Sequence, residues 1–160
     1  MTVTHETTGT RVVVRSVDEL DGLVRSVVEM IRDCTMHDYA AMDRTDAWIE
    51  RDGKVIATGE RKGRPDITHD HYPTALVDLA KWNHLVASEF ATSIPALLFY
   101  GWGCGCVGEI RPAKGLDVQI QITTPSPQSR SLNRGVPRPT VAFRLADVFW
   151  LSRGAHCGAP

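Results

Sequence analysis

The clearest alternation of apolar and polar residues lies in the first half of the chain. Two β-prone runs, residues 46–50 and 55–58, stand on either side of an Asp-Gly pair. Alternation with a period of two is typical of strands, and Asp-Gly between such runs is a strong signal for a tight turn. The pattern therefore predicts a β-hairpin that opens with Asp46 and continues into the sequence Glu-Arg-Lys at residues 60–62.

The length of the turn decides which face each charged residue occupies, because successive side chains of a strand alternate between faces. A two-residue turn would put Asp46 and Glu60 on opposite faces. A three-residue turn over residues 51–53, with its glycine in a bulge, pairs Asp46 with Thr58. Glu60 and Lys62 then share the Asp46 face, and diagonal neighbours lie roughly 7–8 Å apart. We expect the three-residue turn, since this spacing suits two carboxylates that hold one hard cation.

Apolar residues recur at helical spacing in two other segments. Ser16 and Glu19 form a capping-box pattern, and the apolar residues after them predict a helix over residues 17–33. Pro73 suits the first turn of a second helix, which we expect to run to about residue 90. Apolar residues on two sides of this second helix indicate that it is partly enclosed by other elements.

Shorter apolar runs predict the remaining strands, and a short helix follows the last of them. A chain with this order of helices and strands is expected to fold as a mixed α/β domain, α+β in character, with a central sheet. The expected strands span residues 37–42, 94–100, 107–110, 118–122 and 141–145, and the short helix spans residues 146–151.

At 160 residues the chain is long enough for one domain with a genuine core. We assign this single domain to residues 11–151, with a flexible N-terminal arm at residues 1–10 and a flexible tail at residues 152–160. Residues 123–139 form a long Pro- and Ser-rich loop that carries three arginines and no acidic residue. Such length in a loop indicates function or disorder. The three arginines are Arg130, Arg134 and Arg138.

Composition limits the classes of function and the compartment. A formal net charge of -1 gives no general attraction to nucleic acid, so any such contact needs a local basic patch. The first residues lack a signal-peptide pattern, and the longest apolar run, near residues 94–102, is too short to span a bilayer. These features predict a cytoplasmic protein without membrane partners. In that compartment, four cysteines do not indicate a disulfide framework.

The order of an Asp, a hairpin and Glu-x-Lys resembles the core motif of the PD-(D/E)xK nuclease superfamily, which has the restriction-endonuclease-like fold. Residues downstream extend the likeness: Tyr72-Pro73-Thr74, then Lys81 on the expected helix, then the apolar run 94–100. This order is similar to that of small phage and bacterial members. The resemblance implies a central mixed β-sheet flanked by α-helices, and the host cytoplasm as the compartment if a phage encodes the chain.

The resemblance also implies a function, namely a nuclease that hydrolyses DNA phosphodiester bonds with Mg²⁺ or Mn²⁺. Asp46 and Glu60 would hold the cation, together with the backbone carbonyl of Arg61. Lys62 would stabilise the negative charge that develops in the transition state. A homodimer is compatible with this function. The residues expected to bind the DNA backbone are Arg64, Lys81, Arg130, Arg134 and Arg138.

Members of the superfamily often add a carboxylate from their first helix. Glu29 is a candidate here, although it falls opposite the apolar stripe, and Glu19 is a weaker one. Either side chain is readily explained as a solvated residue on a helix surface. In the loop after the motif, His71 is more readily explained as part of the lead-in to the second helix than as a catalytic group.

Two other functions stay open from the sequence. The first is a non-catalytic module that keeps the fold, either a DNA-binding protein or a phage accessory protein. The second is a zinc protein in which Cys104 and Cys106 join Cys34, His156 and Cys157. The pair Cys104 and Cys106 is separated by one residue rather than the two or more usual in zinc sites, which favours ordinary thiols in a glycine-rich turn.

Overall fold

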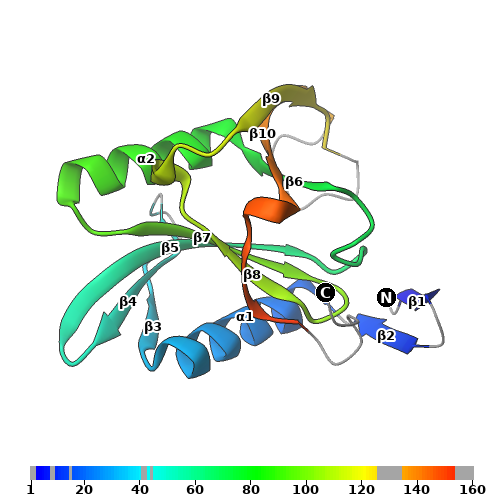
Figure 1. Cartoon of the computed structure of the whole chain (residues 1–160), viewed down its shortest axis with the longest axis horizontal. Coiled ribbons are helices and arrows are strands. Elements are labelled where there is room, and N and C mark those ends of the chain that lie inside the picture. Colours follow the sequence, from blue (N-terminus) through cyan, green and yellow to red (C-terminus); the bar gives the residue numbers. More distant parts are fainter. Residues whose placement is uncertain are drawn as a thin grey trace.

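The chain folds around a six-stranded mixed sheet, with α1 on one face and α2 and a second, three-stranded sheet on the other (Figure 1). This arrangement confirms the expected mixed α/β class. The structure is a computed structural model. It describes the backbone of residues 3–7, 10–14, 16–40, 43, 45–125 and 135–153, and the side chains from residue 16 onward within these ranges.

The longest strand, β5, lies at the centre of the large sheet. It pairs with β7 in parallel and with β4 in antiparallel orientation, and the other neighbours are antiparallel. The strands in spatial order are β11 (Phe149–Ser152), β8 (Val107–Ile110), β7 (Ala96–Trp102), β5 (Lys54–Arg64), β4 (Ala47–Arg51) and β3 (Thr35–Asp38).

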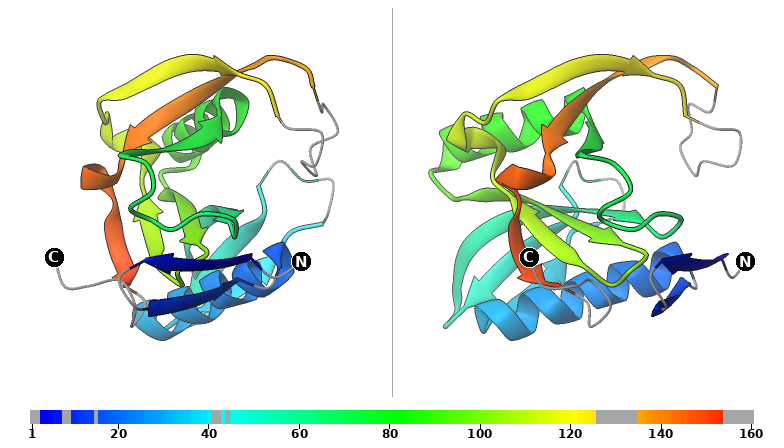
Figure 2. Two further views of the ribbon diagram at one scale, coloured as in Figure 1. Left: turned by 90° about the vertical axis from the view of Figure 1, so that its right-hand side faces the viewer. Right: turned by 45° about the vertical axis from the view of Figure 1, so that its right-hand side comes forward.

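The small sheet is antiparallel and covers part of the α2 side of the large sheet. Its strands in spatial order are β6 (Thr74–Asp78), β10 (Arg138–Arg144) and β9 (Val118–Thr123). The short helices η1 (Pro112–Lys114) and η2 (Leu145–Asp147) connect the two sheets. A separate hairpin of β1 (Val3–Thr7) and β2 (Thr10–Val14) begins in the segment expected to be an arm, residues 1–10, and extends into the first residues assigned to the domain (Figure 2).

Helix α1 (Val17–Arg32) begins where the capping pattern predicts. The Ser16 hydroxyl accepts a hydrogen bond from the Glu19 backbone N–H at 3.1 Å, and Asp33 ends the helix in the left-handed conformation. The apolar stripe is buried against the large sheet, as expected from its spacing. Its buried residues are Leu20, Val24, Val27 and Val28. In the described part of the chain, no helix is both long and apolar enough to cross a membrane.

The structure corrects the sequence-based assignments of the segments at residues 73–90 and 146–151. The segment after Pro73 begins as strand β6, and α2 (Leu79–Thr92) starts only at Leu79. Ala75 and Val77 are buried in alternation because β6 pairs with β10, and this pairing outweighs the helical spacing of the apolar residues. The expected last helix, residues 146–151, is instead η2 followed by β11, which pairs with β8.

Gly59 lies where two strands of the large sheet approach closely. A β-carbon at this position would come within 2.7 Å of the Phe99 ring, which is fully buried on the α1 side. The absence of a side chain at Gly59 thus lets β5 and β7 pair while Phe99 fills the core beneath α1.

Replacing Gly59 by alanine should lower the free energy of unfolding by about 1–3 kcal/mol, because the buried ring has little room to shift. The matched control is Gly22→Ala on α1, where an added β-carbon meets no atom within 4 Å. That variant should gain about 0.5–1 kcal/mol from its higher helix propensity. Chemical denaturation measures both changes, and equal stability of the two variants would contradict the close approach.

Candidate functional site

The hairpin turn contains two residues rather than the expected three. Asp52 and Gly53 have φ angles of 51° and 71°, which is the type I′ conformation. The ladder then slips by one residue, because Glu50 pairs with Val55 but Ile49 pairs with Ala57. Ile56 is therefore the extra residue of a β-bulge. This extra residue shifts the pairing by one position, as the expected three-residue turn would have done.

Beyond the bulge, the register brings the charged residues to one face. Ala47 pairs with Gly59, so the register, continued by one residue beyond β4, puts Asp46 opposite Glu60 rather than Thr58. Residues directly opposite across an antiparallel pair are closer than the diagonal neighbours that the sequence suggested. Because side chains alternate, Lys62 shares this face, which is the one that carries α2.

Glu60 is the buried charge of this site. Only 3% of its surface is exposed, although it is an acidic residue in the central strand. Its Oε1 atom forms an ion pair with Nζ of Lys81, which reaches over from α2. A buried carboxylate requires a cation or hydrogen-bond donors near it, and among the described residues Lys81 is the cation that the structure pairs with Glu60.

Asp46 is held at the edge of the hairpin by two hydrogen bonds of its own and by one that its neighbour makes. Its Oδ2 atom accepts the Arg61 backbone N–H at 2.9 Å, and its carbonyl accepts the Tyr39 N–H at 2.9 Å. The preceding residue, Thr45, contacts Nε2 of His84 on α2 through its hydroxyl at 2.8 Å. These bonds fix the carboxylate of Asp46 beside the backbone of β5 and connect its strand to α2.

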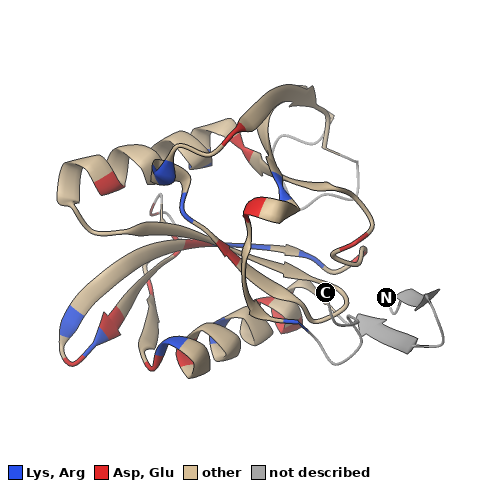
Figure 3. Ribbon diagram, viewed as in Figure 1, with Lys and Arg blue, Asp and Glu red and all other residues tan. Residues whose placement is uncertain are grey.

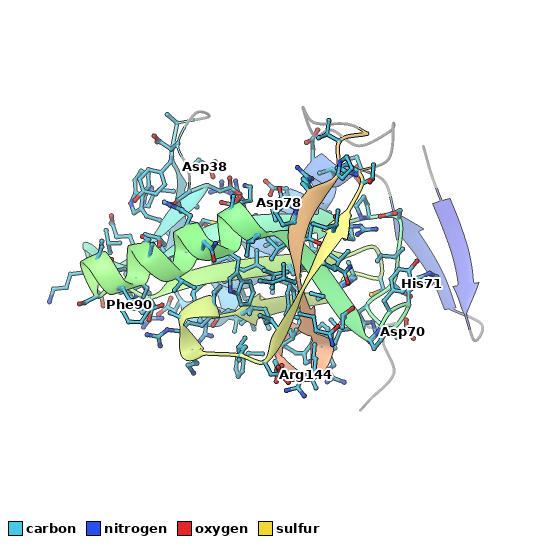
Figure 4. All side chains as sticks on the ribbon, turned by 90° about the horizontal axis from the view of Figure 1, so that it is seen from above. Asp38, Asp70, His71, Asp78, Phe90 and Arg144 are labelled. Atoms are coloured by element: carbon cyan, nitrogen blue, oxygen red, sulfur yellow. The ribbon has the colours of Figure 1, made fainter. Side chains whose placement is uncertain are left out.

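Lys62 is partly buried, and burial lowers the pKa of its ammonium group. The carboxylate of Asp78 opposes this shift, whereas Arg64 and Arg138 add to it. Asp78 itself forms an ion pair with Nε of Arg138 at 3.2 Å, so its charge is shared. Figure 4 shows Asp78 at the junction of β6 and α2, beside β10. The net effect of these surroundings is a Lys62 pKa below the ordinary lysine value.

The side chain of Arg61 points to the opposite face, toward α1. Its guanidinium contacts Oδ1 of Asp21 at 3.1 Å and Oδ1 of Asp38 at 2.9 Å. Burial raises the pKa of Asp21, and Asp46 raises it further, although Arg61 acts in the other direction. Asp21 is therefore an α1 carboxylate in direct contact with Arg61 of the motif. The role of the Arg61 carbonyl stays a prediction.

The α1 residues considered as candidates from the sequence, Glu29 and Glu19, take part in local hydrogen bonds. Glu29 accepts the Met36 backbone N–H at 2.9 Å and so fixes the start of β3, whereas the Glu19 backbone takes part in the N-cap. Asp21 was missed because the sequence did not show which face of the sheet, and so which helix, the side chain of Arg61 would contact. A signal was present in the sequence, because Asp21 is next to Leu20, the first residue of the apolar stripe that packs on the sheet.

The described residues that were expected to bind DNA have acidic or aromatic partners in the fold. Arg64 contacts Asp66 at 3.4 Å and hydrogen-bonds to Tyr100. Lys81 contacts Glu60, and Arg138 contacts Asp78. Arg130 and Arg134 lie outside the described residues. Charges of both signs are interspersed along α1 and the β4–β5 hairpin rather than gathered into a single basic surface (Figure 3).

A cavity of about 310 Å³ lies at the end of β5, two residues beyond Lys62. It opens between the two sheets and combines aromatic walls with one guanidinium. Its lining includes Arg64, Tyr72, Leu76, Tyr100, Trp102 and Gln121.

A second group of metal-ligating side chains lies at the same end of the large sheet. Nδ1 of His69 is 3.3 Å from Sγ of Cys104 and 3.5 Å from Sγ of Cys106. Burial lowers the pKa of His69. Cys34 does not join this group, because it lies at the end of α1 and contacts the Val28 carbonyl. His156 and Cys157 lie outside the described residues.

The donor atoms of the two groups suit different ions. Within the described residues, His69, Cys104 and Cys106 are the group of three or more potential ligands that lie within 4.8 Å of one another. Asp46 and Glu60 offer only carboxylate oxygens, the donors that Mg²⁺ prefers, and Mg²⁺ is often held by one or two carboxylates plus substrate phosphate oxygens. The two carboxylates thus offer the type of donor that hard cations take, and Glu60 is paired with Lys81 in the structure.

Replacing Lys62 by methionine should raise the free energy of unfolding near neutral pH, because the fold penalises the charged amine that the substitution removes. A lysine with a lowered pKa destabilises the fold at pH values below that pKa. The penalty disappears as the pH rises toward the ordinary lysine value of about 10.4, so the gain should shrink over this range.

Denaturation of Lys62→Met at several pH values measures this gain. The control is Lys54→Met on the same strand, where the side chain is exposed and the change should stay within about 0.5 kcal/mol. A Lys62→Met variant that is less stable than the wild type at pH 7 would show that the amine contributes favourably to the fold.

Comparison with known proteins adds no relative: the chain matches no protein-family model and no curated protein sequence.

Proposed function

We propose that the protein is a nuclease that hydrolyses DNA phosphodiester bonds with a divalent cation, Mg²⁺ or Mn²⁺. The observation that carries the proposal is the register of the β4–β5 hairpin, which, extended by one residue beyond β4, brings Asp46 to the face of Glu60 and Lys62. A buried acid and an amine of lowered pKa on one face of a sheet are a combination typical of catalytic sites.

Each residue has a distinct role in this proposal. Asp46 and Glu60 would bind the cation, with the Arg61 carbonyl as a further oxygen ligand. When bound, such a cation polarises a phosphoryl oxygen and lowers the pKa of a bound water. Lys62 stabilises negative charge on the phosphate or orients the attacking water, and its partial burial strengthens its electrostatic effect.

Lys81 serves the site from α2. In the structure its ammonium group balances the charge of the buried Glu60, while 45% of its side chain stays exposed. An exposed lysine beside the carboxylates can contact a DNA phosphate that approaches over α2. Arg64 and Arg138 lie around Lys62 and add positive charge on the same side.

The fold supports the restriction-endonuclease-like assignment. The resemblance implies a central mixed sheet flanked by helices, and the large sheet has α1 on one face and α2 on the other. The elements expected after the motif occur in the expected order: Thr74 opens β6, Lys81 lies on α2, and the apolar run forms β7. β7 pairs in parallel with β5, so the backbone at Glu60 and Lys62 lies beside that of Leu98 and Tyr100.

A non-catalytic module is the second candidate function, and one observation favours it. Arg64, Lys81 and Arg138 all have partners within the fold, which leaves less positive charge for a polyanion. A protein that only binds DNA, or that acts as an accessory protein, would need neither the cation nor Lys62. The two candidates are separated by cation dependence.

Incubation with linear, nicked and branched DNA in Mg²⁺ should give cleavage that EDTA abolishes. Glu60→Gln and Lys62→Met should each lower the rate at least about 100-fold, because the first removes a ligand of the cation and the second removes a charge that stabilises the reacting phosphate. Glu50→Gln on the same hairpin is the control and should keep the wild-type rate. Cleavage that persists in both site variants would rule out this assignment of the site.

Calorimetric titration with Mn²⁺ tests the cation site without catalysis. The wild type should bind Mn²⁺, and Asp46→Asn should weaken the binding at least about 10-fold by removing one anionic ligand. Glu50→Gln should bind as the wild type does. If the wild type binds no Mn²⁺, the non-catalytic module becomes the better account.

A further inference from the structure

Two loops that leave the same edge of the large sheet carry the His/Cys group. β5 and β7 are parallel, and their last pair is Arg64 with Trp102. The carboxyl ends of parallel neighbours meet at one edge, where ligand sites of α/β sheets are commonly found. His69 follows β5 and the two cysteines follow β7, so the topology itself brings them together. Figure 4 shows this end of the molecule, with Asp70 and His71 labelled, opposite the end that carries Phe90.

Backbone hydrogen bonds connect the two loops. The Gly103 N–H donates to the carbonyls of Arg64 and Ile67, at 3.0 and 2.9 Å. The His69 N–H donates to Sγ of Cys104 at 3.4 Å. Gly105, with a φ of 83°, reverses the chain between the two cysteines so that both sulfur atoms approach the same imidazole. An N–H donor to a cysteine sulfur stabilises its thiolate form, which is the form that binds metals.

The distances agree with ligation of one tetrahedral ion. Bond lengths of about 2.3 Å for Zn–S and 2.0–2.1 Å for Zn–N put the nitrogen and sulfur ligands of one zinc roughly 3.6 Å apart. The two measured separations from Nδ1 of His69 are 3.3 and 3.5 Å. The donor set of one imidazole and two sulfurs is one that zinc prefers over magnesium.

Cys106 is disulfide-bonded in the structure, contrary to the expectation of ordinary thiols. Cys34 and Cys104 are free. In a reducing compartment such a bond is open, and Cys106 then offers a thiolate to the same imidazole. Ligation and the disulfide compete for one sulfur atom, so the oxidation state of Cys106 decides whether the group is complete.

We propose that His69, Cys104 and Cys106 bind one Zn²⁺ ion when Cys106 is reduced, at a site distinct from the carboxylate pair. A phosphine reductant opens the disulfide by giving up two electrons and becoming a phosphine oxide, with the oxygen from water and the two protons on the thiols. Zinc binding then releases one proton from each of the two cysteines. The ion connects the loop after β5 to the turn after β7.

The test uses the full-length chain, reduced with a phosphine and freed of metal, and titrated with Zn²⁺ against a chromophoric chelator. The reduced protein should bind one Zn²⁺ per chain, and Co²⁺ at the same site should give sulfur-to-cobalt charge-transfer absorption. Cys104→Ser and His69→Gln should each weaken zinc binding at least about 10-fold. Cys34→Ser is the matched cysteine control and should bind as the wild type does.

Three outcomes would overturn the proposal. They are a reduced wild type that binds no zinc, undiminished binding in His69→Gln, and equal binding before and after reduction. Because Cys104 is buried, circular dichroism must show that Cys104→Ser folds, and His69→Gln on the partly exposed loop decides the matter if it does not. Asp46→Asn should keep full zinc affinity. The zinc proposal and the proposed nuclease function can therefore fail independently of each other.

Discussion

The burial of Glu60 is the constraint on which the rest of the structure depends. A carboxylate in the middle strand of the main sheet, with 3% of its surface exposed, is unfavourable unless positive charge lies beside it. Lys81 supplies that charge from α2, and so the helix must cross the sheet where β5 carries Glu60. The small sheet, which pairs β6 with β10 and leads into α2, sets where the helix begins.

The same strand separates two charged environments. On the α1 side, Arg61 is neutralised by Asp21 and Asp38, so this arginine stabilises the contact between helix and sheet. On the α2 side, Glu60 and Lys62 are two residues apart on one face, near Asp46. The ion pairs on the side facing α1 therefore have a structural role. The side facing α2 combines a buried acid, Glu60, with an amine of lowered pKa, that of Lys62.

Local signals in the sequence predicted the elements whose interactions are local. The Ser16 cap and the apolar stripe define α1, and the hairpin follows from its alternation and its Asp-Gly pair. The turn was predicted with the wrong length, because the bulge at Ile56 depends on how the strand packs on the core. β6 was missed for a similar reason, since its pairing with β10, some 65 residues later in sequence, outweighs local helical spacing.

The candidate site was only partly predictable. Its motif residues could be identified from their order, but the partners of Glu60 and Arg61 come from elements whose positions depend on tertiary packing. The His69 group was not predicted because it requires knowledge that β5 and β7 run in parallel. His69 and Cys104 are both close in sequence to the ends of these strands, so a correct topology would have brought the two together.

The most direct measurement of the central claim is anomalous diffraction from crystals soaked in Mn²⁺. If Asp46 and Glu60 hold the cation, an anomalous peak lies about 2.0–2.3 Å from carboxylate oxygens of both residues, on the side of the sheet that faces α2. Crystals with no peak at these two side chains, and with Lys81 still in contact with Glu60 at saturating Mn²⁺, would contradict it.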